Sequence, residues 1–139
     1  MSEREPLSLV LFSGTDDRLD SATMLIAGAA ASGRSVHVLL QYWALEAFRR
    51  DSIRKDHGVS AEAGPEGASV LGRWQEQNPV HWSDTLRQVK AMGRVRILAC
   101  SMSMDLFHLA PGDLDPMVDG VEGIASFWAG ADGGSVMFV

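Results

Sequence analysis

Two short apolar runs separated by a segment of helical length constrain the fold of this chain most strongly. The runs are residues 7–12 and 36–40, and residues 18–31 between them carry small and apolar side chains at helical spacing. Gly33 provides the stop on which helices commonly end. Strand, helix and strand in this order form a βαβ unit, in which the two strands are parallel and the crossover is right-handed.

The rest of the chain continues the same alternation. Residues 95–99 form an apolar run bounded by polar residues, which is typical of a buried parallel strand. Further elements are expected as helices at 44–50, 84–92 and 122–131, a helical turn at 114–118, and strands at 119–121 and 135–139. The pattern predicts a single α/β domain over residues 1–139. We expect a three-layer α/β/α sandwich with about five mainly parallel strands and a flavodoxin-like appearance.

Residues 51–80 interrupt this alternation with glycines, prolines and mixed charges that show no sustained period. This composition predicts a long, partly mobile surface excursion with one turn of helix near residues 70–75. A stretch of this kind is functional, ordered by a partner chain, or disordered. Ser83 follows it as the expected N-cap of the helix at 84–92.

The composition excludes several classes of function. A net charge of −6 without a long basic run argues against binding to nucleic acid. No window approaches the roughly 18 apolar residues that a membrane span needs, and the charged residues 1–6 do not form a signal peptide. We therefore expect a cytoplasmic protein that binds neither membrane nor nucleic acid. Its one cysteine rules out an internal disulfide, and no cluster has the spacing of metal ligands, so no metal or cofactor is expected.

That cysteine, Cys100, stands where the strand at 95–99 gives way to a helix. Ser101 and Ser103 are residues that often cap helix N-termini, and residues 104–109 can continue the helix. The position is the carboxyl edge of the sheet, where open α/β folds bind their ligands. Backbone N–H groups of residues 101–103 would stabilise an anionic sulfur there. Met102 is interpreted as a packing residue that can also line a soft, sulfur-tolerant pocket. The alternative is a buried, inert thiol that serves as a small apolar side chain.

The loop after the first strand, Ser13-Gly14-Thr15, ends at the same sheet edge. A glycine-containing loop in this place can cradle a phosphate, but Asp16 follows it directly and would repel one. A helix cap is therefore the favoured interpretation of Ser13 to Asp16. These residues can also shape the pocket beside the thiol, because both loops lie at one edge of the sheet.

Two aromatic residues, Tyr42 and Trp43, are expected at the end of the second strand. They are interpreted as core or interface side chains that can also wall the thiol pocket and exclude water. His37, within the second strand, is interpreted as a packing residue.

Three stretches together resemble the DsrE/DsrF-like sulfur-relay family. They are residues 11–16, residues 28–31 with Tyr42-Trp43 beyond them, and the segment Ala99-Cys100-Ser101-Met102-Ser103-Met104-Asp105. The resemblance implies a DsrE-like fold, a homo-oligomer that is a trimer or hexamer, and a persulfide carried on Cys100. It implies possible sulfurtransferase activity rather than peroxidase activity.

Two functional hypotheses follow. In the first, the protein is a sulfur carrier or sulfurtransferase that accepts sulfane sulfur on Cys100 from a donor persulfide or a small thiolic sulfur compound and passes it to the thiol of an acceptor protein. Sulfur donor and acceptor proteins are the expected partners. A single cysteine suits this chemistry, because the sulfur must leave to another molecule. In the second, the chain is a non-enzymatic module that binds a small molecule or a partner on the same scaffold, with Cys100 as a pocket wall.

Overall fold

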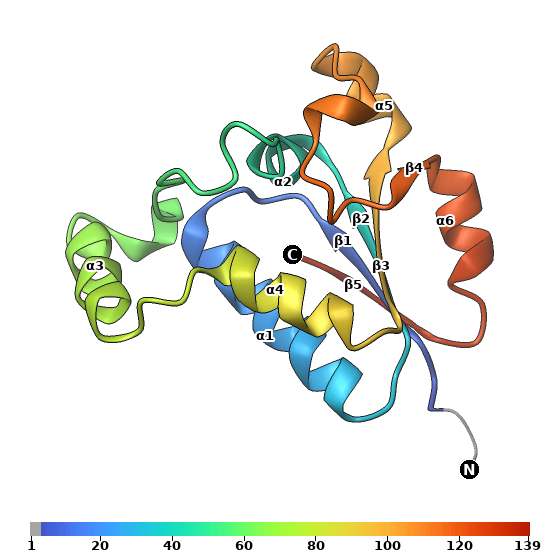
Figure 1. Ribbon diagram of the computed structural model, residues 1–139, viewed down its shortest axis with the longest axis horizontal. Coiled ribbons are helices and arrows are strands. Elements are labelled where there is room, and N and C mark those ends of the chain that lie inside the picture. Colours follow the sequence, from blue (N-terminus) through green and yellow to red (C-terminus); the bar gives the residue numbers. More distant parts are fainter. Residues whose placement is uncertain (1–3) are drawn as a thin grey trace.

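The computed structural model describes residues 4–139, so part of the charged segment used above against a signal peptide, residues 1–3, lies outside the described residues. The chain forms one five-stranded sheet in which all neighbouring strands are parallel (Figure 1). The strands are β1 (Leu7–Leu11), β2 (Val36–Leu40), β3 (Val95–Cys100), β4 (Gly120–Glu122) and β5 (Ser135–Phe138), in the spatial order β4-β3-β2-β1-β5. The expected α/β class with five parallel strands is confirmed.

Helices cover both faces of this sheet. Helices α1 (Asp16–Ala31) and α4 (Trp82–Ala91) lie side by side on one face, and α6 (Ile124–Gly130) lies on the other (Figure 1). Along each central strand the side chains alternate between two cores. In β3, Ile97 joins the larger core under α1 and α4, whereas Leu98 joins the smaller core with Phe127 of α6. Burial on both faces explains why these strands are continuous apolar runs rather than alternating ones.

The order of the strands creates a crevice at the carboxyl edge. The chain winds in one direction from β1 to β4, and α6 then carries it back to β5 beside β1. Helix α5 (Ser101–Leu106), which follows β3, places Met104 in the larger core, whereas α6, which follows β4, places Phe127 in the smaller core. After the adjacent strands β3 and β4, the chain therefore continues to opposite faces of the sheet. Such a change of direction leaves a crevice at the ends of the two strands, and open α/β sheets bind their ligands there.

The second helix, α2 (Tyr42–Ala47), begins two residues earlier than the expected 44–50 and ends earlier as well. Gln41 still belongs to the strand edge, because its N–H donates to the carbonyl of Leu11 (2.9 Å). The chain then turns sharply at Tyr42, whose φ of 46° is uncommon for a residue other than glycine. Tyr42 and Trp43 therefore form the first turn of α2 and do not end the second strand.

Other boundaries also differ from expectation. Helix α4 begins at Trp82, because the His81 side chain accepts a hydrogen bond from Ser83 N–H (3.2 Å) and so caps the helix; the prediction of Ser83 as the cap is wrong. The helix expected at 122–131 covers only Ile124–Gly130, since Gly120–Glu122 pairs with β3 as β4. In place of the helical turn at 114–118, a 3₁₀ turn, η2, covers Pro111–Asp113.

The excursion predicted at residues 51–80 is more structured than expected, and the helical turn expected near residues 70–75 lies within a longer helix. It contains a 3₁₀ turn, η1 (Ala61–Ala63), and an eleven-residue helix, α3 (Gly67–Gln77), that stands away from the sheet (Figure 1). The segment of the excursion that leads to α3 is anchored to the start of α1. Asp16 accepts a hydrogen bond from His57 N–H (2.9 Å), and Asp17 accepts from the N–H and hydroxyl of Ser60 (3.0 and 2.6 Å). These anchors are distant in sequence, so local composition does not reveal them.

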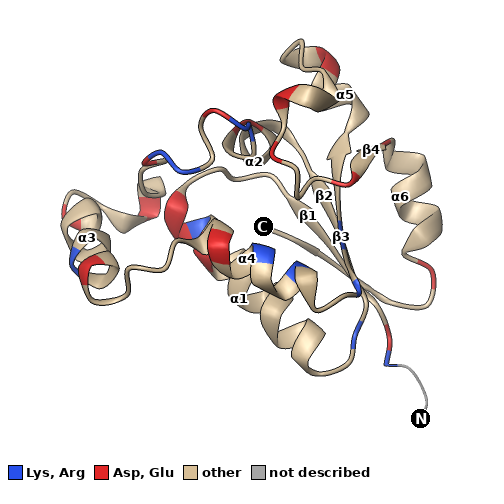
Figure 2. Ribbon diagram, in the orientation of Figure 1, with Lys and Arg blue, Asp and Glu red and all other residues tan. Residues whose placement is uncertain are grey.

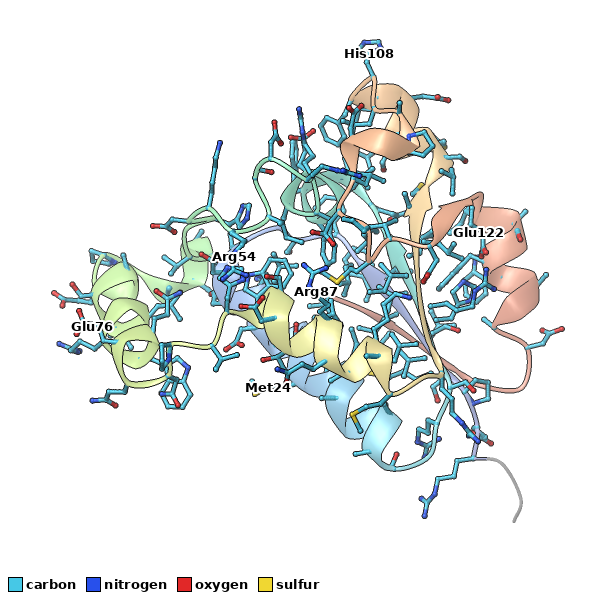
Figure 3. The ribbon with its side chains drawn as sticks, in the orientation of Figure 1. Met24, Arg54, Glu76, Arg87, His108 and Glu122 are labelled. Carbon is cyan, nitrogen blue, oxygen red and sulfur yellow. The ribbon has the colours of Figure 1, made fainter. Side chains whose placement is uncertain are left out.

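A buried carboxylate, Asp115, joins α4 to the segment before β4. Arg87 projects from α4 (Figure 3) and donates to both carboxylate oxygens of Asp115 (3.0 and 3.2 Å), while Met117 N–H donates to one of them (2.9 Å). Burial by itself would raise the pKa of Asp115, but these hydrogen bonds lower it further than burial raises it. The pKa of the Asp115 carboxyl therefore lies below the ordinary value of 3.8.

This lowered pKa predicts that Asp115 stabilises the fold only while it is ionised. Its contribution is present above the pKa of the unfolded chain and is lost as the pH falls through the lower pKa of the folded chain. We expect Asp115→Asn to reduce the free energy of unfolding by about 2 kcal/mol near neutral pH, and the difference from the parent to shrink below about pH 4. Urea denaturation at both pH values measures this. Asp105→Asn, at an exposed carboxylate, is the control, and a difference independent of pH would contradict the assignment.

Candidate functional site

Cys100 lies at the junction predicted from the sequence, as the last residue of β3 and the N-cap of α5. Its side chain is buried, with 4% of the residue exposed, and it packs in the smaller core with Leu98 and Phe127. The amide Nε2 of Gln41 donates to its Sγ at 3.8 Å. Sequence reasoning did not select Gln41. The available signal was its position directly after β2, at the same edge of the sheet as Cys100.

A cavity of about 660 Å³ opens at this edge between α2, α5 and the start of α6. The predicted residues that line it are Tyr42, Cys100, Ser101, Met102 and Ser103. The lining residues that sequence reasoning missed are Gln41, Leu106, Gly123, Ile124 and Ala125. Gly123 to Ala125 could have been suggested by the rule that every loop at the carboxyl ends of the strands borders the same crevice. The volume is within the range of small-molecule sites.

Ser103 positions the site rather than holds the sulfur. Ser103 is buried, and its hydroxyl accepts a hydrogen bond from Tyr42 N–H (3.0 Å), which ties α2 to α5. Within the part of the chain that the structure describes, the Cys100 side chain accepts no capping hydrogen bond from the α5 backbone. The prediction that N–H groups of residues 101–103 hold the sulfur is therefore not met here. The donor is the Gln41 amide.

The loop after β1 does not border the Cys100 cavity. Ser13, Gly14 and Thr15 line a separate hollow with Arg18, Trp43 and His57. A Cβ at residue 14 would collide with the backbone carbonyl of Trp43, so the close approach of α2 requires the glycine found there. The physical reason for the separation is the strand order. Because β2 lies between β1 and β3, helix α2 stands between the two loops.

Two further residues that were predicted to line the thiol pocket lie outside the Cys100 cavity. Trp43 lines the hollow of the β1 loop, so of the two aromatic residues only Tyr42 reaches the Cys100 cavity. Asp16 is 4% exposed and is occupied by structural hydrogen bonds from His57 N–H and Trp82 Nε1 (2.9 and 3.0 Å). Its expected role in shaping the thiol pocket is corrected to that of an anchor for the excursion.

A histidine–glutamate pair lies near Cys100, on the neighbouring strands of the sheet. Glu122 on β4 is the direct register partner of Cys100, and it lies beside α6 (Figure 3). Its Oε1 is 3.3 Å from Nε2 of His37, whose ring packs against Phe127 with a centroid distance of 5.3 Å. His37 thus packs against Phe127, as predicted, and its Nε2 and Glu122 Oε1 are buried beside each other without a hydrogen bond between them.

Within residues 4–139, the structure contains no group of three or more histidine, cysteine, aspartate or glutamate residues placed to hold a metal ion. No helix in the same described range is long and apolar enough to cross a membrane.

Comparison with known proteins supports the fold. No protein-family model matches the chain. It is 29% identical over 149 residues to Uncharacterized protein YrkE of Bacillus subtilis (strain 168), with 93% of this chain and 92% of that protein covered. Its structure is similar to that of MTH1491 from Methanobacterium thermoautotrophicum, a protein of unknown function, with a TM-score of 0.61 and 14% sequence identity. That match covers 98% of this chain and 100% of MTH1491, which shares the α/β fold.

Proposed function

We propose that the protein is a sulfur carrier or sulfurtransferase that holds sulfane sulfur on Cys100 as a persulfide. The observation that carries the proposal is the placement of the sole cysteine. Cys100 lines a cavity at the carboxyl edge of a parallel sheet, and an uncharged amide donates a hydrogen bond to its sulfur. The resemblance of residues 99–105 to the DsrE/DsrF-like family adds support from the sequence.

The chemistry consists of two thiolate exchanges without net oxidation. The Cys100 thiolate attacks the outer sulfur of a donor R–S–SH, the donor S–S bond breaks, and R–S⁻ leaves as Cys100–S–SH forms. The thiolate of an acceptor then attacks the same outer sulfur and regenerates the Cys100 thiolate. The Gln41 amide stabilises the anionic sulfur without protonating it, as preorganised donors do. Because no second cysteine exists, the sulfur can leave only to another molecule.

The proposal includes donor and acceptor proteins, self-association into the trimer or hexamer that the resemblance implies, and a reducing cytoplasmic location. Exposed apolar side chains are available for self-association. Phe138 on the edge strand β5 is 68% exposed, and Trp128 on α6 is 58% exposed.

The test is intact-protein mass spectrometry of the reduced chain after incubation with a hydropersulfide. We expect a gain of one sulfur atom that disappears on treatment with a reductant. Transfer of that sulfur to an added thiol, with return of the protein to its original mass, distinguishes a carrier from a dead-end adduct. No gain, together with slow alkylation of the native thiol, would overturn the proposal and favour a non-enzymatic binding module with Cys100 as a pocket wall.

A further inference from the structure

We propose that the Cys100 cavity selects donors R–S–SH whose organic group R is uncharged and apolar over donors whose organic group is anionic. This inference rests on the proposed function and adds the class of substrate to it. The reaction is the exchange described above, in which the outer sulfur moves to Cys100 and R–S⁻ leaves.

The lining of the cavity supports an apolar occupant. Its rim carries exposed apolar side chains from three helices: Tyr42 from α2 is 39% exposed, Met102 from α5 is 72% exposed, and Ile124 from α6 is 43% exposed. Leu106 and Ala125 extend the same surface. Besides the Cys100 thiol, the polar side-chain groups among the lining residues are the Gln41 amide and the hydroxyls of Tyr42 and two serines, all of them formally uncharged. An apolar group bound here would gain about 25 cal/mol for each Å² that it removes from water.

The charge around the cavity disfavours an anion. Among the described residues that line it, none carries a formal charge. No lysine or arginine follows Arg96 in the sequence, so α5, β4 and α6 contribute no such cation. The charged residues nearest in the chain are acidic, Asp105 on α5 and Glu122 on β4, and the ribbon of α5 and β4 shows acidic segments without basic ones (Figure 2). An anionic donor would lose hydration here without gaining a partner of opposite charge.

The size of the cavity allows the donor's organic group to enter along with the sulfur. Its volume of about 660 Å³ exceeds what the sulfur atoms alone would occupy. The structure therefore provides a surface that can distinguish one R group from another. Selectivity would come from burial of that group on the methionine, leucine and isoleucine side chains, and from exclusion of carboxylates.

The experiment compares two donors on the reduced full-length chain. Benzyl hydropersulfide supplies an uncharged apolar group, and glutathione hydropersulfide supplies an anionic one. The initial rate of sulfur uptake by the protein is measured by intact mass spectrometry. It is divided by the rate at which a small reference thiol takes up sulfur from the same donor. This ratio removes the difference in intrinsic reactivity between the two donors. We expect a normalised preference for the benzyl donor on the order of tenfold or more, equivalent to about 1.4 kcal/mol.

Two variants with the same change in charge test the cause. Met102→Lys places a cation on the rim and is expected to reduce the preference severalfold. Met92→Lys changes an exposed methionine at the end of α4, outside the cavity, and is expected to leave the preference unchanged. Equal normalised rates for the parent, or equal effects of the two variants, would overturn this inference while the proposed function stands. Failure of both donors to load sulfur would overturn the proposed function itself.

Discussion

The Cys100→Ser variant is expected to gain no reducible sulfur under conditions in which the parent chain gains one atom. A serine hydroxyl is close in size to the thiol, so it can retain the contact with Gln41 Nε2, but it cannot attack a sulfane sulfur as a thiolate does. Because the chain contains no other cysteine, uptake is expected to fall to the background level. Intact mass spectrometry before and after reduction measures the loss.

The matched control for this prediction is Ser101→Ala, which changes the next residue in the cavity lining and keeps the thiol. It is expected to load sulfur at a rate within a fewfold of the parent. Circular dichroism and urea denaturation verify that both variants fold, since Cys100 packs in the smaller core. Reducible sulfur on a folded Cys100→Ser variant would show that the thiol is not the carrier.

The Asp16→Ala variant is expected to be the most destabilised of the single-residue changes considered. Asp16 is buried and accepts hydrogen bonds from His57 N–H and Trp82 Nε1. Removing its carboxylate leaves two donors without their partner, and each such loss costs about 1–3 kcal/mol. We expect the free energy of unfolding to fall by about 3 kcal/mol or more, measured by urea denaturation. Amide hydrogen exchange should show lost protection at His57, where the excursion is anchored.

Two comparisons separate this anchoring role from a general effect of charge. Asp16→Asn keeps an amide oxygen as an acceptor and is expected to have an intermediate effect. Asp51→Ala removes an exposed carboxylate and is expected to change stability by less than about 0.5 kcal/mol. Full protection of His57 in the Asp16→Ala variant would contradict the proposed anchor.

Local sequence patterns were sufficient for the sheet and its principal helices. Apolar runs at the positions of β1, β2 and β3 are visible because strands buried on both faces must be apolar throughout. The position of Cys100 also follows from local sequence, because it ends such a run. Helix α3 was expected only as one turn near residues 70–75, because the segment before it is anchored to Asp16 and Asp17, which lie at the start of α1 and far away in the sequence. The start of α4 was misplaced because a histidine caps it in place of the expected serine.

The sequence by itself determined that a single thiol ends a buried parallel strand at the carboxyl edge of an α/β sheet. Only the tertiary structure decided which neighbours share its cavity. Strand order places α2 between Cys100 and the loop at Ser13–Thr15, so those loop residues line a different hollow. The same order brings Gly123 and Ile124, which follow β4, to the cavity. The physical reason is that local pattern specifies elements, whereas strand order and the directions in which loops leave the sheet specify which side chains meet.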